Sequence, residues 1–208
     1  DTRKVFGEDI KVVVAENIPR KPIDEISKSN KTPGQLRLVY LSLIAEKKNL
    51  LQLLQIIAGL KENVSLDIYG PVKDVDYWKK CLEVLNTAAG RINYKADVLP
   101  VEVQSTFSKY DASILLTKGE NFGHAIYESF SAGRPVITSY FTPWKELEEK
   151  EAGWNVDISK EEEITAALKK ISLMHKDAFD AYCEGAHQLA KEYFHKRVDT
   201  GLYKKLFS

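Results

Sequence analysis

Residues 36–69 read LRLVYLSLIAEKKNLLQLLQIIAGLKENVSLDIY, and this stretch decides the fold. Residues 36–42 are a nearly continuous apolar run, which predicts a strand buried on both faces of a sheet. Residues 64–69 alternate apolar and polar side chains, as a second strand does. Between the two, one helical stripe is formed by Leu50, Leu53, Leu54, Ile57 and Leu60. A strand, a helix and a strand in succession predict a parallel sheet, because parallel neighbours need a crossover connection.

The same alternation of strand and helix patterns continues toward the C-terminal part of the chain. The expected strands are residues 91–94, 112–116, 136–139 and a short one after residue 153, and the expected helices are residues 77–85, 100–110, 123–132, 161–174 and 178–194. A last amphipathic piece surrounds Leu202 and Leu206. We therefore predict an α/β fold, in which a Rossmann-like parallel sheet is covered by helices on both faces.

The first 35 residues differ in kind from the rest. Residues 11–15 include a short valine strand, whereas residues 19–34 contain three prolines and few apolar side chains, which is typical of a linker. We divide the chain accordingly into an interdomain linker with a short strand, residues 1–35, and one domain with C-terminal helices, residues 36–208.

The composition indicates an ordinary globular domain, with 44% hydrophobic and 29% charged residues in a chain of 208. Thirty basic and 30 acidic side chains cancel, so no global field attracts nucleic acid or an acidic membrane. The cysteines Cys81 and Cys183 are too few and too far apart for a disulfide framework or a zinc site, so we expect a reducing cytoplasm. No apolar stretch approaches the roughly 20 residues of a transmembrane helix, and no signal peptide is evident.

One loop of the predicted sheet carries the chemistry. Ligands bind outside the carboxyl ends of parallel strands, so the loops after Ser42, Tyr69, Tyr94 and Leu116 are expected to form one rim. The last of these loops reads Thr117-Lys118-Gly119-Glu120-Asn121-Phe122-Gly123-His124, and the helix after it carries Glu128 and ends at Ala132-Gly133-Arg134-Pro135.

Two glutamates separated by seven residues, with Phe-Gly between them and Ala-Gly-x-Pro after them, resemble the motif of the family 4 glycosyltransferases of the GT-B fold. The resemblance extends from about Asn17 to Gly153-Trp154 and includes Lys47-Lys48-Asn49-Leu50 and Thr142-Pro143-Trp144. It implies the C-terminal, nucleotide-sugar-binding half of a retaining hexosyltransferase that serves glycan or polysaccharide biosynthesis. The N-terminal half, which holds the acceptor, is expected to be missing from this chain, and peripheral membrane contact by the full-length protein stays open.

The residues themselves also support a diphosphate-binding site. Gly123 has no side chain, so a ligand can approach the backbone where a helix starts, and the free N–H groups there favour phosphate. By resemblance, Glu120 is the catalytic candidate that faces the donor sugar, and Glu128 binds the ribose. The full donor-binding set expected is Lys48, Lys95, Ala96, Asn121, Phe122, Gly123, His124 and Glu128. The alternative is that Glu120 only complements the helix dipole and that Glu128 is solvated.

The basic side chains also have two interpretations. Lys47 and Lys48 stand at a predicted helix start, where the dipole disfavours a cation, and a bound diphosphate would offset this cost. Lys48 is the preferred contact because it aligns with the phosphate-binding lysine of the family, and the alternative is a pair of solvated surface lysines. Lys95 and Ala96 follow the strand where relatives hold the nucleobase, and His124 either touches the diphosphate or is an ordinary first-turn residue.

Two positions depart from the family pattern. Leu43 stands where the family usually has a phosphate-binding arginine, and the loss of one charged hydrogen bond costs about 1.5 to 3 kcal/mol of binding. Tyr140 replaces a frequent aspartate, with no consequence that can be deduced. Taken as lacking an Asp-x-Asp metal motif, a histidine cluster and a P-loop, the chain is expected to bind phosphate without a metal ion or a cofactor.

Three other readings remain open from the sequence. Leu43 motivates a non-catalytic GT-B-like scaffold or regulatory domain. A GT-B enzyme of the sugar-nucleotide epimerase type fits the same motif. A flavodoxin-like domain fits poorly, because no acidic cluster follows the first core strand.

Overall fold

The computed structural model describes residues 7, 17, 19–28, 30–88 and 90–198 of the chain. Its centre is a six-stranded sheet with the order β3-β2-β1-β4-β5-β6, and every pair of neighbours is parallel. The strands are β1 Gln35–Leu41, β2 Asn63–Tyr69, β3 Ile92–Tyr94, β4 Ala112–Leu115, β5 Val136–Ser139 and β6 Gly153–Val156. The predicted Rossmann-like sheet is therefore confirmed, whereas the strand expected at residues 11–15 lies outside the described residues.

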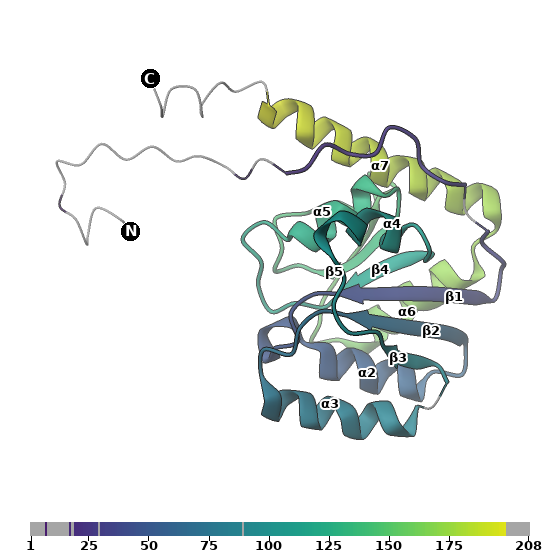
Figure 1. Ribbon diagram of the computed structural model, residues 1–208. Helices are drawn as coiled ribbons and strands as arrows, with labels where there is room; N and C mark the ends of the chain where they lie inside the picture. The colour runs from purple at the N-terminus through teal and green to yellow at the C-terminus, as the bar shows by residue number, and fades with distance from the viewer. Residues whose placement is uncertain (1–6, 8–16, 18, 29, 89, 199–208) are drawn as a thin grey trace.

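Helices cover both faces of this sheet (Figure 1). The α-helices are α2 Leu50–Gly59, α3 Val75–Thr87, α4 Val103–Phe107, α5 His124–Ser131, α6 Glu161–Leu173 and α7 Lys176–Val198, and the 3-10 helices are η1 Glu46–Lys48 and η2 Pro100–Glu102. Helices α2 and α3 lie on one face, α4 and α5 lie on the other, and α7 packs against α5. No helix within the described residues is long and apolar enough to span a membrane. The amphipathic piece expected around Leu202 and Leu206 lies outside these residues.

Strand β1 is buried from both sides, which explains its nearly continuous apolar run. Leu38 and Tyr40 belong to the main hydrophobic core, whereas Val39 packs in a smaller core with Phe107 and Ala132 on the opposite face. All three β1 side chains are fully buried. A central strand of this kind needs apolar residues at consecutive positions rather than at alternate ones.

The helix expected over residues 100–110 is shorter than predicted. A 3-10 turn, η2, leads into α4, which ends at Phe107. The chain must leave the helix early because Asp111 is already fixed to β1: its N–H donates to the carbonyl of Arg37 at 2.9 Å, and its carboxylate accepts the N–H of Arg37 at 2.7 Å. A long-range contact therefore sets this boundary.

Residues 19–34, predicted as a linker, pack against the domain. The hydroxyl of Tyr127 on α5 donates to the carbonyl of Arg20 at 2.8 Å, and His187 on α7 contacts the carbonyl of Ile23 at 2.8 Å. The ammonium group of Lys31 is buried and donates to the carbonyls of Thr32, Gln35 and Ser172. Whether this segment also connects two domains stays a prediction.

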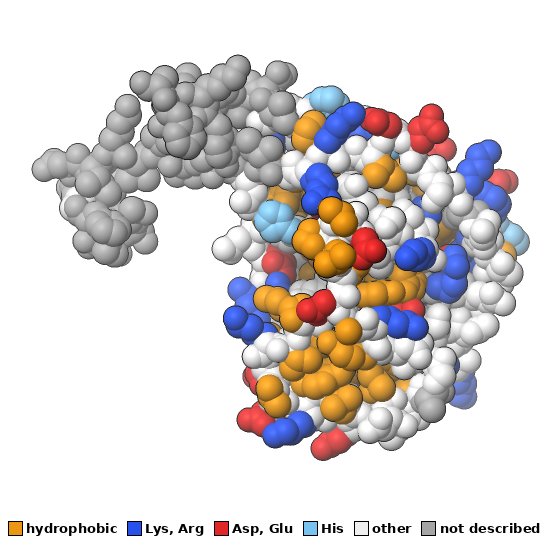
Figure 2. Space-filling model, in the orientation of Figure 1, with side chains coloured by type: hydrophobic (Ala, Val, Ile, Leu, Met, Phe, Trp, Pro, Cys, Tyr) orange, Lys and Arg blue, Asp and Glu red, His pale blue; other side chains and the backbone are white. Residues whose placement is uncertain are grey.

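Several large hydrophobic side chains remain exposed near the carboxyl ends of the strands. Leu43 follows β1 and is 44% exposed, and Tyr140 and Phe141 follow β5 and are 53% and 57% exposed. Leu99 and Val101, after β3, are 63% and 76% exposed. Figure 2 shows hydrophobic side chains gathered on one face of the molecule, over the region of β3 and α3.

Candidate functional site

The topology places the switch point of the sheet between β1 and β4. Strand β1 leads into η1 and α2 on one face of the sheet, and β4 leads into α5 on the other. The loops that follow these strands, residues 42–49 and 116–123, therefore lead to opposite faces of the sheet, at the point where the strand order reverses. Ligands of open parallel sheets bind at such a switch point, outside the carboxyl ends of the strands.

A lysine and a glutamate meet at this switch point. Lys48, at the end of η1, donates from Nζ to Oε1 of Glu120, and the two side chains are only 18% and 12% exposed. The loops are also joined through the backbone, since the N–H of Lys118 donates to the carbonyl of Lys47 at 2.8 Å. The structure brings Lys48 and Glu120 into contact, as the sequence led us to expect, and their roles toward a ligand stay predictions.

Glycine is required at the start of α5. Gly123 has a φ of 79° in the left-handed region, and a Cβ there would lie 3.0 Å from Cδ1 of Ile126. No side chain caps this helix start, so N–H groups of its first turn face the rim without a side-chain acceptor. A helix start of this kind can bind an anion, because free N–H groups and the helix dipole point toward it.

Phe122 packs in an aromatic cluster beneath this helix start. Its side chain is 6% exposed and packs against the rings of His124, Tyr127, Trp144 and Tyr193. The indole N–H of Trp144 donates to the carbonyl of Phe122 at 2.6 Å. Phe122 was expected among the donor-binding residues; its ring belongs to this aromatic cluster, and a contact of its backbone with a donor stays a prediction.

Glu128 lies one helical turn deeper and is half-buried. Its Oε2 atom is buried and has no hydrogen-bond partner among the described residues. Burial of the carboxyl group raises the pKa of Glu128, and nearby Arg20, Gln104 and His124 only partly oppose this effect. A buried carboxylate oxygen without a donor is costly in the empty protein and is a natural acceptor for a ligand hydroxyl.

The other predicted donor contacts are less closely grouped. Asn121 and His124 are exposed beside the start of α5. Lys95 and Ala96 follow β3, two strands away from β1, and Lys95 Nζ lies 3.7 Å from Oδ2 of Asp67. Ala96 has a φ of 63°, an unusual left-handed conformation for alanine, and its carbonyl accepts the N–H of Gly70 at 3.0 Å. These two residues share the rim but do not contact the Lys48–Glu120 pair.

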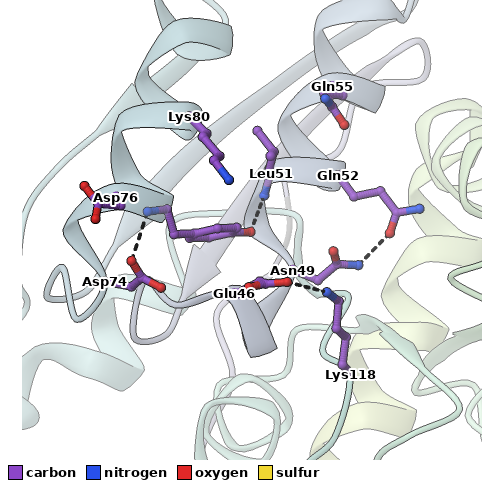
Figure 3. Close-up of a pocket in the computed structure, with 10 residues that line it drawn as sticks. Glu46, Asn49, Leu51, Gln52, Gln55, Asp74, Asp76, Lys80 and Lys118 are labelled. Atoms are coloured by element: carbon purple, nitrogen blue, oxygen red, sulfur yellow. Dashed lines mark hydrogen bonds and ion pairs between the residues drawn. The ribbon is translucent and has the colours of Figure 1, made fainter.

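A separate cavity of about 370 Å³ lies between the starts of α2 and α3 (Figure 3). It is lined by Glu46, Asn49, Leu51, Gln52, Gln55, Asp74, Asp76, Tyr77, Lys80 and Lys118. Neither Lys48 nor Glu120 is among these residues, so this cavity is not the predicted donor site.

The expectation that the chain has no Asp-x-Asp sequence is wrong, because Asp74-Val75-Asp76 is one, and its two aspartates line this cavity. Asp74 caps α3 by accepting the N–H of Tyr77 at 2.9 Å, and Asp76 is 87% exposed and binds Lys79 at 2.8 Å. Within the described residues, no three histidine, cysteine or acidic side chains lie close enough to hold a metal ion. The aspartates therefore serve as a helix cap and a surface ion pair.

Comparison with known proteins agrees with this geometry. The family model described as "Glycosyl transferases group 1" matches residues 22–185. No curated protein sequence matches at a significant level.

Solved structures share the fold at low sequence identity. HepE of Anabaena, in complex with UDP and glucose, has 16% identity and a TM-score of 0.73, over 84% of this chain and 49% of its own. Sucrose-phosphate synthase of Thermosynechococcus elongatus has 17% identity and a TM-score of 0.72, over 83% and 46%. TarM of S. aureus, solved with UDP among its ligands, has 12% identity and a TM-score of 0.76, over 98% and 41%. The chain thus spans about half the length of these proteins or less.

Proposed function

This chain belongs to the group 1 glycosyl transferases, and we propose that it is the donor-binding half of a retaining hexosyltransferase. In this proposal the full protein moves a sugar from a nucleoside-diphosphate sugar to an acceptor during glycan or polysaccharide biosynthesis. The observation that carries the proposal is the contact of Lys48 with Glu120 at the switch point, on the rim that also holds the uncapped start of α5.

The arrangement suits the departure of a nucleoside diphosphate from a sugar. Negative charge develops on the leaving phosphate in the transition state, and groups already aimed at that position stabilise it. Lys48 and the N–H groups that open α5 are such groups, and we assign this role to them without a metal ion or a cofactor. Glu120 would accept hydrogen bonds from the sugar hydroxyls, and Oε2 of Glu128 would accept one from the ribose.

The choice of ligand to test first comes from the similar structures. HepE is described in complex with UDP and with UDP-glucose, and TarM in complex with UDP. We propose that this chain likewise binds a nucleoside diphosphate, with UDP as the first candidate. Cys81 and Cys183 are both buried free thiols, which supports our proposal of a reducing, cytoplasmic setting.

Calorimetric titration of the chain with UDP, GDP and ADP tests the proposal. We expect weak but measurable binding of at least one of them, and a loss of about tenfold or more in Lys48→Ala and in Glu128→Ala, the size of one charge-assisted hydrogen bond. Lys169→Ala, which removes an exposed lysine of α6, serves as the matched control and should bind like the wild type. Failure of every nucleotide to bind would contradict the proposal.

Leu43 favours a second candidate, a GT-B-like scaffold or regulatory domain without turnover. Its side chain is apolar and 44% exposed on the loop after β1, where it offers no charge to a phosphate. Nucleotide binding without sugar transfer in the full-length protein would favour this alternative. A sugar-nucleotide epimerase would instead convert the donor when no acceptor is present, and product analysis with donor alone separates the two.

A further inference from the structure

Three lysines surround the turn formed by Gly119 and Glu120, and they differ in how their charges are used. Lys48 is paired with Glu120, and Nζ of Lys118 lies 3.4 Å from Oε1 of Glu46. Lys47 forms no ion pair with any residue that the structure describes. It is therefore the lysine of the three whose charge remains unshared.

The backbone of Lys47 is held firmly against the loop after β4. Its carbonyl accepts the N–H of Lys118 at 2.8 Å and the hydroxyl of Thr117 at 3.3 Å. These contacts fix the position from which the Lys47 side chain departs.

The Lys47 side chain lies directly over Gly119. A Cβ at Gly119 would lie 3.3 Å from Cε and 3.7 Å from Nζ of Lys47. The backbone of Gly119 is not in the left-handed region, so its conformation alone does not demand glycine. The missing side chain leaves room for the lysine instead, directly beside Glu120.

The proposed donor site needs more positive charge than its other groups supply, and Lys47 could provide it. Lys48 and Glu120 together sum to zero, and a helix start contributes only about half of a positive charge. A nucleoside diphosphate brings more than one negative charge, so these groups alone leave much of it unbalanced. Resting on the proposed function, we propose that Lys47 supplies the unshared positive charge of the diphosphate subsite and makes it prefer nucleoside diphosphates over monophosphates.

The test compares UDP with UMP in calorimetric titrations of the whole chain. We expect Lys47→Ala to weaken UDP binding about tenfold, the effect of one charge-assisted contact, and to change UMP binding much less. Lys47→Arg should keep most of the affinity because it keeps the charge. Lys169→Ala controls for the loss of one positive charge elsewhere on the surface.

A second variant tests the position of the side chain rather than its charge. In Gly119→Val a branched side chain occupies the space above residue 119, so Lys47 must move. UDP binding should weaken as in Lys47→Ala, and the double variant should lose little more than either single one. Circular dichroism and thermal unfolding establish that each variant remains folded.

The outcomes separate this inference from the proposed function. Unchanged UDP affinity in Lys47→Ala, or an equal loss for UDP and UMP, overturns the role of Lys47 while the donor site stands. If wild-type chain binds none of UDP, GDP and ADP, the proposed function fails and this inference falls with it.

Discussion

At the scale of single residues, Lys48 and Glu120 show how two opposite charges are held at the candidate site. Each side chain is mostly buried, and each has its charge balanced by the other. A buried charge without a partner is costly, so the pair keeps both ions in place until a ligand arrives. In the donor site that we propose, an incoming diphosphate would share Lys48 with Glu120, and the sugar hydroxyls would donate to the carboxylate.

A double-mutant cycle measures this mutual dependence. We expect Lys48→Met to lower the free energy of unfolding by about 1 to 3 kcal/mol, because Glu120 is left without its cation. The double variant Lys48→Met/Glu120→Gln should recover part of this loss, which gives a coupling energy of about 1 kcal/mol in urea unfolding. Strictly additive effects of the two changes would show that the pair does not interact in solution.

The raised pKa of Glu128 predicts how the stability of the chain depends on pH. Burial raises the pKa of this carboxyl group in the folded chain, so ionised Glu128 destabilises the empty protein above that pKa, and the cost disappears as the pH falls below the unfolded value. Glu128→Gln should therefore stabilise the nucleotide-free chain by about 1 kcal/mol at pH 7, with a smaller gain in acid. Thermal unfolding over a pH series measures the difference.

The same Glu128→Gln variant should bind UDP more weakly, because an amide oxygen is a poorer acceptor for the ribose than a carboxylate. A variant that gains stability and loses affinity identifies a carboxylate kept for binding. If Glu128→Gln destabilised the empty chain at pH 7, another contact would have to satisfy Oε2.

At the scale of one element, the start of α5 depends on Gly123. In Gly123→Ala the new Cβ adds left-handed strain and crowds Ile126, so the free energy of unfolding should fall by about 1 to 2 kcal/mol. UDP affinity should fall as well, because the N–H groups that open the helix are displaced. Gly90→Ala offers a matched control, because Gly90 has a φ of 84°, nothing lies within 4 Å of its Cβ position, and it precedes β3, at the opposite edge of the sheet from the loops after β1 and β4.

Urea unfolding and UDP titration of both glycine variants separate the two effects. Loss of stability in both, with loss of affinity only in Gly123→Ala, is the expected result. Equal affinities in the two variants would indicate that the α5 start does not contact the ligand.

Local patterns predicted most elements, and long-range packing explains what they missed. The stripe of α2 and the apolar run of β1 are properties of neighbouring residues, and both elements occur close to their expected bounds. The end of α4 depends on Asp111 meeting Arg37, and the burial of Phe122 depends on Tyr193. Neither contact can be inferred from local spacing.

In the candidate site, too, some features could be predicted from the sequence and others depend on long-range packing. Lys48 and Glu120 were predictable as neighbours because the carboxyl ends of β1 and β4 meet at one edge of the sheet. Two other features depend on how the side chains pack, so no sequence motif indicates them. They are the buried Oε2 atom of Glu128, which has no hydrogen-bond partner among the described residues, and the position of Lys47 over Gly119.

At the scale of the whole molecule, the candidate site lies on an edge of the sheet that leaves apolar side chains exposed. Leu43, Tyr140 and Phe141 belong to the loops that follow β1 and β5, and each is about half exposed. The similar solved chains are about twice as long as this one. Both facts support our proposal that a second half of the protein faces this rim and holds the acceptor.

The packing of residues 19–34 predicts that the folded domain begins before β1. Pro19 and Pro22 are buried, Ile26 packs against the core, and Lys31 donates to three carbonyls. A chain that starts at Leu36 loses all of these contacts. We expect it to be less stable by about 3 kcal/mol than a chain that starts at Asn17, which lowers Tm by about 6 to 12 °C.

Thermal unfolding of the two truncated chains, followed by circular dichroism, measures this difference. Lys31→Met in the longer chain separates the ammonium contacts from the rest, and it should cause only part of the loss because the apolar packing of Ile26 remains. Equal Tm values for the chains starting at Asn17 and at Leu36 would mean that residues 19–34 behave as an independent linker. A large difference would make the segment part of the folded domain, joined to α5 through the contact of Tyr127 with Arg20.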